Sequence, residues 1–422
     1  MTRTRIVVLG GGFGGVEAAR QLERRLRHRE DVDVTLVSSD NFFLFTPMLH
    51  EVAASDVDIT HIVSPLRALL HSTNIVVGDV QEIDLERRVV RVVHGDDAHS
   101  HELQYDQLLI TLGSTTNFYG QPGLEQHAVT MKTLGDAIHL RNRVIGALEQ
   151  ASTECETGAA GLLTVVVAGG GFAGVETIAA VNDFMREALA FYPRLRQSDL
   201  RLLLVHAGPH LLPELGEDLG VYAARKLIDR GIEIKTSTRV AAVDSERVTF
   251  SDGTSVASRL LVWTAGTSPH PLLQALPCRL DRGRVVVDET LAVPGWPGVW
   301  ALGDCAVVPD VRTGRPHPPT AQHALREART AAANIHAAID GRPAVPFAFR
   351  TIGQLAAIGR RTGVARIFGI KFSGFLAWWL WRTIYLSKLP RFEKKVRVAL
   401  DWTLDLLFPK DFVQFMTFRE RG

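Results

Sequence analysis

The 422-residue sequence predicts an α/β fold with two similar parallel-sheet domains and a C-terminal segment of different character. Three observations lead to this prediction. A strand that runs into a glycine-rich turn and a helix opens the chain, the same succession recurs in its middle, and a basic, tryptophan-rich stretch ends it. At about 150 residues per domain, this length suits two or three domains with a large buried core.

The first strand, turn and helix surround a glycine motif of the form G-x-G-x-x-G. Gly10 permits a tight turn, Gly12 lets a pyrophosphate approach the backbone, and Gly15 lets the helix pack on the strand. The helix N-terminus then offers free N–H groups to the phosphates. This context predicts a Rossmann-like dinucleotide-binding domain. Its elements are a strand at residues 5–9, the motif at 10–15, a helix at 16–27 and a second strand at 32–37.

The same pattern recurs 159 positions further along, at Gly169 instead of Gly10. Two such motifs in one chain imply two dinucleotides, and we interpret them as a flavin dinucleotide, FAD, and a nicotinamide dinucleotide, NAD(P)H. The members of the second pattern are a strand at 163–168, Gly169, Gly171 and Gly174, a helix at 175–189 and a second strand at 199–205.

Three further apolar strands end near a glycine. Gly113 and Gly266 each follow a buried-type strand, and each marks a place where the chain can cross between the two domains. Gly303 precedes Asp304 after another short strand, and this carboxylate suits a polyol such as the ribityl chain of a flavin. An aspartate that caps the next turn fits the local sequence equally well.

The composition argues against several classes of protein. With 47 basic and 46 acidic side chains, the net charge is +1, which disfavours a nucleic-acid partner. The cysteines lack the spacing of a redox pair or a zinc site, so we expect no metal and a reducing compartment, with Cys305 as a packed residue. A histidine cluster near residue 100 is interpreted as a solvated hairpin rather than a metal site. These residues are Cys155, Cys278 and Cys305, and His94, His99 and His101.

The C-terminal stretch is basic, whereas the rest of the chain is acidic. Residues 360–422 contain 13 Lys or Arg, 5 Asp or Glu and four of the seven tryptophans. Arg397, Asp401 and Asp405 fall on one stripe of a helix whose other faces are apolar. We expect an amphipathic helical segment that docks on an anionic membrane surface. Packing on its own domain and a homodimer interface are the alternatives.

No segment of the sequence is long and apolar enough to span a bilayer, and the first strand begins too early to follow a signal peptide. We therefore expect a peripheral protein on the cytoplasmic side of the cell membrane.

Several segments together resemble the type II NADH:quinone oxidoreductases, which are flavoproteins with two dinucleotide-binding domains. The resemblance covers essentially the whole chain. It implies an FAD-dependent enzyme that does not pump protons, in which hydride passes from the nicotinamide to FAD and two electrons then reach a membrane quinone. The segments that carry it are residues 43–53, 169–176, 303–305, 320–324, 368–383 and 400–402.

The motifs and the resemblance together assign roles to individual residues. Glu176 and Gln322 are the expected catalytic residues, and Ala321 with Gln322 is expected beside the quinone. A carboxylate that stabilises the first turn of a helix is the alternative for Glu176, and a surface amide is the alternative for Gln322. The expected FAD-binding residues are Gly10, Gly12, Phe13, Gly15, Ser38, Thr46, Gly113, Gly303 and Asp304. The expected NAD(P)H-binding residues are Gly169, Gly171, Gly174, Glu176, His206 and Gly266.

Two positions depart from the family pattern, which places an acidic residue at the end of each second strand to bind a ribose. Ser38 stands at the first position, can still bond to a hydroxyl, and is followed closely by Asp40. His206 stands at the second, where no carboxylate remains to repel a 2′-phosphate. We expect NADH as the substrate, with NADPH possible.

The expected domains are an FAD domain at 1–115 and 281–345, a nicotinamide domain at 116–280 and a membrane-docking segment at 346–422. Two alternatives remain. One is a reductase of the same fold with another electron partner, such as the sulfide:quinone type, although paired sulfur-handling cysteines are missing. The other is a nucleotide-sensing flavoprotein with slow turnover.

Overall fold

The computed structural model describes residues 3–95, 99–153 and 161–415, so Cys155 lies outside the described residues. The chain divides into two compact units. Unit 1 comprises residues 1–44, 63–115 and 267–351, and unit 2 comprises 45–62, 116–266 and 352–422.

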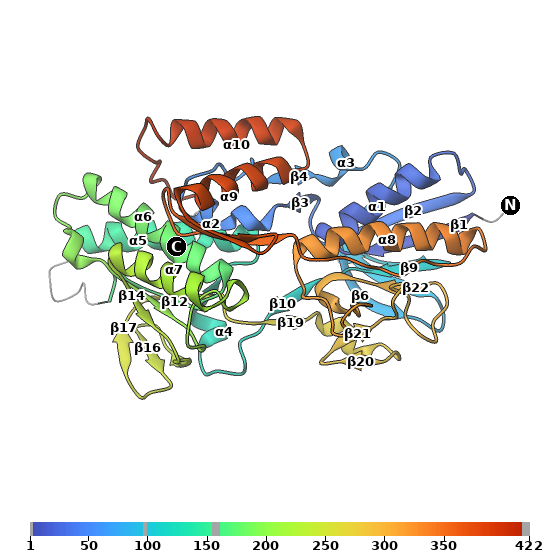
Figure 1. Ribbon diagram of the computed structural model, residues 1–422, viewed down its shortest axis with the longest axis horizontal. Helices are drawn as coiled ribbons and strands as arrows, with labels where there is room; N and C mark the ends of the chain where they lie inside the picture. Colours follow the sequence, from blue (N-terminus) through green and yellow to red (C-terminus); the bar gives the residue numbers. More distant parts are fainter. Residues whose placement is uncertain (1–2, 96–98, 154–160, 416–422) are drawn as a thin grey trace. The chain divides into compact units, whose positions relative to one another are not determined.

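Unit 1 is built on a parallel five-stranded sheet with the order β22-β9-β1-β2-β5. Val8 pairs with Leu36 on one side and Leu109 on the other, and all three side chains are fully buried. Helices α1 and α8 lie side by side (Figure 1). The bounds are β1 (Thr4–Leu9), β2 (Val32–Ser38), β5 (Asn74–Val77), β9 (Gln107–Ile110), β22 (Val299–Ala301), α1 (Phe13–Leu26) and α8 (Ala321–Ile339).

Unit 2 repeats this arrangement with the order β11-β18-β12-β13-β14, again all parallel. Val167 pairs with Leu204 and Val262, and these three side chains are also fully buried. Runs of Val and Leu form these strands because both faces of a parallel sheet are covered. The bounds are β11 (Ala128–Thr130), β12 (Thr164–Ala168), β13 (Arg201–Val205), β14 (Ile232–Lys235), β18 (Leu260–Trp263) and α6 (Phe172–Ala188).

Smaller elements complete unit 1. Strands β6, β7 and β8 form an antiparallel meander, and the histidine cluster lies on its last hairpin, where the rings of His94 and His101 stack at 4.5 Å. Within the described ranges, no group of three His, Cys, Asp or Glu could hold a metal ion. The bounds are β3 (Phe42–Leu44), β4 (Val63–Pro65), α3 (Leu66–Leu69), β6 (Asp79–Asp84), β7 (Val89–His94), β8 (His99–Gln104), β10 (Ser114–Thr116), β19 (Thr267–Pro269), η5 (Pro271–Ala275), β20 (Leu280–Asp281), β21 (Arg284–Val286), η6 (Gly303–Cys305) and β23 (Ala306–Val307).

Unit 2 contains a matching meander, β15-β16-β17, and a C-terminal antiparallel sheet, β24-β25-β26. Helix α2 packs on α5 and α6. The bounds are η1 (Thr46–Met48), α2 (Leu49–Ala53), α4 (Leu124–His127), α5 (Leu134–Thr153), η2 (Leu189–Phe191), η3 (Gln197–Asp199), η4 (Pro213–Leu215), α7 (Glu217–Asp229), β15 (Val240–Val243), β16 (Arg247–Phe250), β17 (Ser255–Ala257), β24 (Gly353–Ala357), β25 (Gly363–Ile367) and β26 (Ile370–Gly374).

The chain ends in two neighbouring helices, α9 (Phe375–Lys388) and α10 (Phe392–Leu404) (Figure 1). None of the helices in the described part of the chain combines the length and the apolar character needed to cross a bilayer. Among the tryptophans expected at a lipid surface, Trp381 and Trp402 are instead buried in unit 2, whereas Trp379 is exposed. The tryptophans of the C-terminal segment therefore lie partly in the protein interior and partly on its surface.

The acidic stripe of α10 faces the protein. The Asp401 carboxylate lies 2.5 Å from the Nδ1 of His61, and the Asp405 carboxylate accepts a hydrogen bond from Arg360 at 2.9 Å. The opposite face of the helix and the residues after it are apolar and exposed. These residues include Phe392, Val396, Leu400, Leu404, Leu406, Leu407 and Phe408.

Candidate functional site

The first glycine motif forms an open cradle between β1 and α1. Gly10 has a φ of +108°, and a Cβ on Gly15 would lie 1.8 Å from the Gly10 carbonyl oxygen. Side chains are therefore excluded at both positions. A Cβ on Gly12 would instead meet no atom within 4 Å. This empty space beside the helix N-terminus fits the pyrophosphate of a dinucleotide.

The second motif has the same geometry in unit 2. Gly169 has a φ of +119°, a Cβ on Gly174 would lie 1.8 Å from the Gly169 carbonyl oxygen, and Gly171 faces open space. The residues of this motif fit a second dinucleotide for the same reasons as in unit 1.

A threonine supports each cradle from the neighbouring strand. The Oγ1 of Thr111 donates to the Leu9 carbonyl at 2.7 Å, and the Oγ1 of Thr264 donates to the Ala168 carbonyl at 2.9 Å. Neither threonine was identified from the sequence. The sequence does contain a signal for them, because each threonine lies two residues before a glycine at which the chain can cross between the domains, Gly113 or Gly266.

Ser38 and His206 occupy equivalent places under the middle of each glycine loop. A Cβ on Gly11 would lie 2.2 Å from the Ser38 Oγ, and the Gly170 N–H donates to the Nδ1 of His206 at 3.0 Å. Partial burial lowers the pKa of His206, which favours its neutral form. The imidazole is thus held in place by the loop, and it supplies no negative charge there.

The residues expected around a flavin ribityl chain form a hydrogen-bonded group in unit 1. The Gly303 N–H donates to Glu327 at 2.8 Å, and the Oγ of Ser114 donates to Asp304 at 2.9 Å. Burial raises the pKa of Glu327 to about 7. The structure thus brings Asp304 together with the residue that follows Gly113. Glu327 was not identified because only the packing of α8 reveals its burial.

Other expected site residues lie at the ends of elements. Ala321 and Gln322 are the first two residues of α8 in unit 1, and Thr46 begins η1 in unit 2. The ring of Phe13 packs edge-on against Phe43, with centroids 5.0 Å apart.

Cys305 is a packed residue. Its thiol is fully buried and donates to the Leu302 carbonyl at 3.1 Å, and burial raises its pKa to about 12. Such a thiol is a poor nucleophile. Cys305 is therefore not a reactive cysteine of the kind that a sulfide:quinone activity needs.

Glu176 lies in the first turns of α6 and is buried. Its Oε1 accepts hydrogen bonds from the Trp381 indole N–H at 2.9 Å and from the Ala357 N–H at 3.1 Å. The Nδ1 of His50 lies 3.8 Å from its Oε2. Burial raises the pKa of Glu176 to about 8 and lowers that of His50 to about 3, so both groups are neutral near pH 7. Because Oε1 already accepts two N–H groups, the proton belongs on Oε2.

A second buried carboxyl group, Glu51, lies in the neighbouring helix α2 and was not identified from the sequence. It accepts a hydrogen bond from the Trp402 indole at 3.0 Å, and burial raises its pKa to about 8. The guanidinium of Arg382, which lies over the Trp402 ring at 4.6 Å, opposes that increase. When Glu51 is ionised, its charge adds to the increase in the pKa of Glu176.

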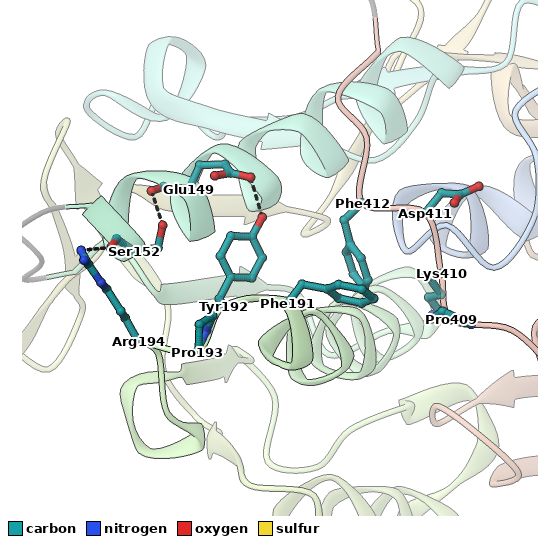
Figure 2. Close-up of a pocket in the computed structure, with 10 residues that line it drawn as sticks. All are labelled: Glu149, Ser152, Phe191, Tyr192, Pro193, Arg194, Pro409, Lys410, Asp411 and Phe412. Atoms are coloured by element: carbon teal, nitrogen blue, oxygen red, sulfur yellow. Dashed lines mark hydrogen bonds between the residues drawn. The ribbon is translucent and has the colours of Figure 1, made fainter.

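A cavity of about 710 Å³ lies elsewhere in unit 2, between the end of α5, residues 191–194 and residues 409–412 (Figure 2). The Tyr192 hydroxyl donates to Glu149 at 2.8 Å, and the rings of Phe191 and Phe412 lie 5.3 Å apart. None of the expected site residues lines this cavity.

We predict that Glu176→Gln stabilises the protein increasingly as the pH rises. The raised pKa of Glu176 means that folding stability is greatest below the normal pKa of 4.5 and is lost as the pH rises towards about 8. Glutamine keeps the neutral form and its acceptor oxygen at every pH. The Tm of the variant should match the wild type near pH 4.5 and exceed it by several degrees at pH 8. Differential scanning calorimetry across this range checks this.

The exposed Glu125 on α4 provides the matched control, because Glu125→Gln should give no comparable trend. A Tm difference for Glu176→Gln that stays constant or shrinks with rising pH would contradict the assignment of a neutral, buried acid.

Comparisons with known proteins agree with this geometry. A family model described as pyridine nucleotide-disulphide oxidoreductase matches residues 4–328, and one described as NDH2 C-terminal domain matches residues 352–411. The type II NADH:quinone oxidoreductase Ndh of Mycobacterium tuberculosis is 34% identical, over 96% of this chain and 88% of that protein. Demethylphylloquinone reductase NdbB of Synechocystis is 31% identical, over 95% of this chain and 96% of that protein.

Solved structures confirm the predicted fold. NDH2 from Plasmodium falciparum in complex with NADH has a TM-score of 0.89 at 20% identity, with 97% of this chain and all of that chain covered. The sulfide:quinone oxidoreductase of Aquifex aeolicus has a TM-score of 0.71 at 17% identity, with 96% and 94% covered. From the family models and the full-length sequence relatives, the chain belongs to the type II NADH:quinone oxidoreductase family of pyridine nucleotide-dependent flavoproteins, the family that its sequence motifs resemble.

Proposed function

We propose that this protein is an FAD-dependent NADH:quinone oxidoreductase that does not pump protons. The observation that carries the proposal is the duplicated cradle, with open space at both Gly12 and Gly171, in a chain of this family. The unit 1 motif would hold FAD and the unit 2 motif would hold NADH. FAD, when bound, supplies the two-electron chemistry between the hydride donor and the quinone.

The chain's own residues align the substrates and supply one proton. NADH delivers a hydride, whereas reduction of a quinone to a quinol takes up two electrons and two protons, so one further proton is required. Glu176 is the proposed donor, because it carries a proton on Oε2 near neutral pH while Trp381 and Ala357 hold its Oε1. Ala321 and Gln322 are the proposed contacts of the quinone.

The two cradles can be tested separately by filling each with a side chain. Gly12→Val should give a folded, colourless protein because the isopropyl group would occupy the pyrophosphate space. Gly171→Val should keep its flavin but lose reduction by NADH. Wild-type protein should be yellow, with about one FAD per chain bound non-covalently. Absorption spectra before and after addition of NADH measure both outcomes. Full flavin retention in Gly12→Val would refute the assignment of the first cradle.

We further propose that the protein discriminates only weakly between NADH and NADPH, with NADH preferred. His206 is neutral and hydrogen-bonded to the Gly170 N–H, so it neither repels a 2′-phosphate nor clamps one as an arginine would.

His206→Glu should raise the NADH:NADPH ratio of kcat/KM by about tenfold or more, since a carboxylate restores the repulsion of the 2′-phosphate. His206→Gln is the matched control, because it can accept the loop hydrogen bond without adding charge and should leave the ratio unchanged. Steady-state kinetics with both nucleotides measure the ratio. A wild-type ratio above about a thousand, ~4 kcal/mol, is incompatible with this proposal.

Our proposed membrane-docking surface is the apolar face of α10 together with the exposed apolar residues that follow it, and it would lie on the cytoplasmic side of the membrane. Leu400, Leu404 and Leu407 are 50–71% exposed, while exposed basic residues such as Lys388 and Arg397 lie nearby in sequence. Exposed leucines next to lysine and arginine suit an anionic bilayer surface. A homodimer interface is the alternative use of this face.

Substitution of the exposed face tests docking better than truncation does, because Trp381 and Trp402 are buried in unit 2. Leu404→Glu with Leu407→Glu should release the protein from anionic vesicles and slow reduction of a long-chain quinone, while flavin reduction by NADH persists. Val221→Glu with Ile228→Glu is the control, since both residues are 57% exposed on α7. Co-sedimentation with vesicles at low salt measures binding. Wild-type protein that stays in the supernatant as a dimer would favour the interface alternative.

A further inference from the structure

Tyr119 is an exposed aromatic residue in an unfavourable backbone conformation. Its φ is +53°, a region that residues other than glycine seldom adopt, and the residue is 60% exposed. Such strain persists only where surrounding contacts enforce it, and it is concentrated at binding sites. The preceding residue, Phe118, packs against the core of unit 2. Of these two neighbouring aromatic residues, one is therefore partly buried and the other is exposed.

Hydrogen bonds hold this segment against the end of β18. The Asn117 N–H donates to the Gly266 carbonyl at 3.2 Å, the Trp263 indole donates to the Asn117 carbonyl at 2.9 Å, and the Tyr119 N–H donates to the Asn117 side chain at 2.7 Å. The Tyr119 ring stands edge-on to that of Trp263, with centroids 6.4 Å apart. The position of Tyr119 is therefore determined by these contacts.

The Tyr119 phenol occupies the space beside Gly266. A Cβ on Gly266 would lie 2.3 Å from the Tyr119 hydroxyl oxygen and 2.7 Å from its Cζ. Gly266 thus makes room for this ring. A ligand that approaches Gly266 from the side on which the Tyr119 ring lies therefore contacts Tyr119 before it contacts the Gly266 backbone.

The topology of unit 2 predicts which ligand reaches this loop. Strand β13, which follows β12 in the chain, lies on one side of β12, whereas the later strand β18 lies on its other side. The direction in which strands are added to the sheet therefore reverses between β12 and β18. Dinucleotides bind at such a point, beyond the carboxyl ends of the strands. With NADH in the proposed unit 2 cradle, the pyrophosphate would lie at Gly171, and the adenosine half would lie towards the end of β13, at His206. The nicotinamide half must then extend over the end of β18, where Gly266 and Tyr119 lie.

We propose that Tyr119 binds the nicotinamide half of the dinucleotide, with its phenol ring packed against the nicotinamide or its ribose. This inference rests on the proposed assignment of NADH to the unit 2 cradle. It adds a binding residue on a segment that carries no glycine motif.

Equilibrium titration of the FAD-loaded protein with NAD⁺ and with ADP tests the proposal, because ADP lacks the nicotinamide half. Tyr119→Ala should weaken NAD⁺ binding about three- to tenfold, the range expected for one aromatic contact, and leave ADP binding unchanged. Tyr119→Gly should show the same selective loss without a lower Tm, because glycine relieves the positive φ. Tyr119→Phe should retain binding if the ring makes the contact.

Equal loss of NAD⁺ and ADP binding in Tyr119→Ala, together with a lower Tm of Tyr119→Gly, would assign Tyr119 a structural role and overturn the proposal. Unchanged NAD⁺ binding in Tyr119→Ala would overturn it as well. Wild-type protein that binds neither ligand would instead contradict the proposed function itself. Phe191→Ala is the control, because Phe191 is comparably exposed in the same unit but lies at the separate cavity of Figure 2.

Discussion

Both units depend on one constraint, which is the close approach between the backbone of a helix and the backbone of the turn that joins it to the preceding strand. In each unit the third glycine of the motif lies where any Cβ would collide with the carbonyl oxygen of the first, at Gly15 and Gly10 and again at Gly174 and Gly169. This contact fixes the helix so that its N-terminus opens onto the space beside the second glycine. The strand order and the supporting threonine are also repeated in both units.

The C-terminal segment provides hydrogen bonds to buried acids as well as an exposed surface. Trp381 and Ala357 both donate to Glu176, and Trp402 donates to Glu51, so two buried acids depend on residues far along the chain. Each acid has a raised pKa because it is buried, and the indole groups supply hydrogen bonds without supplying charge. Glu176 and Glu51 can therefore retain a proton near neutral pH beneath a C-terminal segment whose outer face remains apolar.

Local features of the sequence predicted the fold and the two cradles because glycine spacing directly reflects a local backbone geometry. The burial of Glu51 and Glu327 was not predictable in this way, since it arises from packing between elements that are distant in sequence. Periodicity correctly placed Asp401 and Asp405 on one stripe of a helix, yet it contains no information on which stripe meets the protein. Composition likewise suggested a lipid role for the tryptophans, although Trp381 is buried as a hydrogen-bond donor.

The proposed function requires that one chain passes electrons from NADH through a bound flavin to a quinone. Anaerobic single-turnover spectroscopy tests it most directly, with wild-type protein mixed first with NADH and then with a short-chain quinone. We expect the oxidised flavin absorption to be lost within the first mixing step and to return fully in the second, both fast enough to support steady-state turnover. Flavin that NADH leaves oxidised, or reduced flavin that the quinone does not reoxidise, would refute the proposed function.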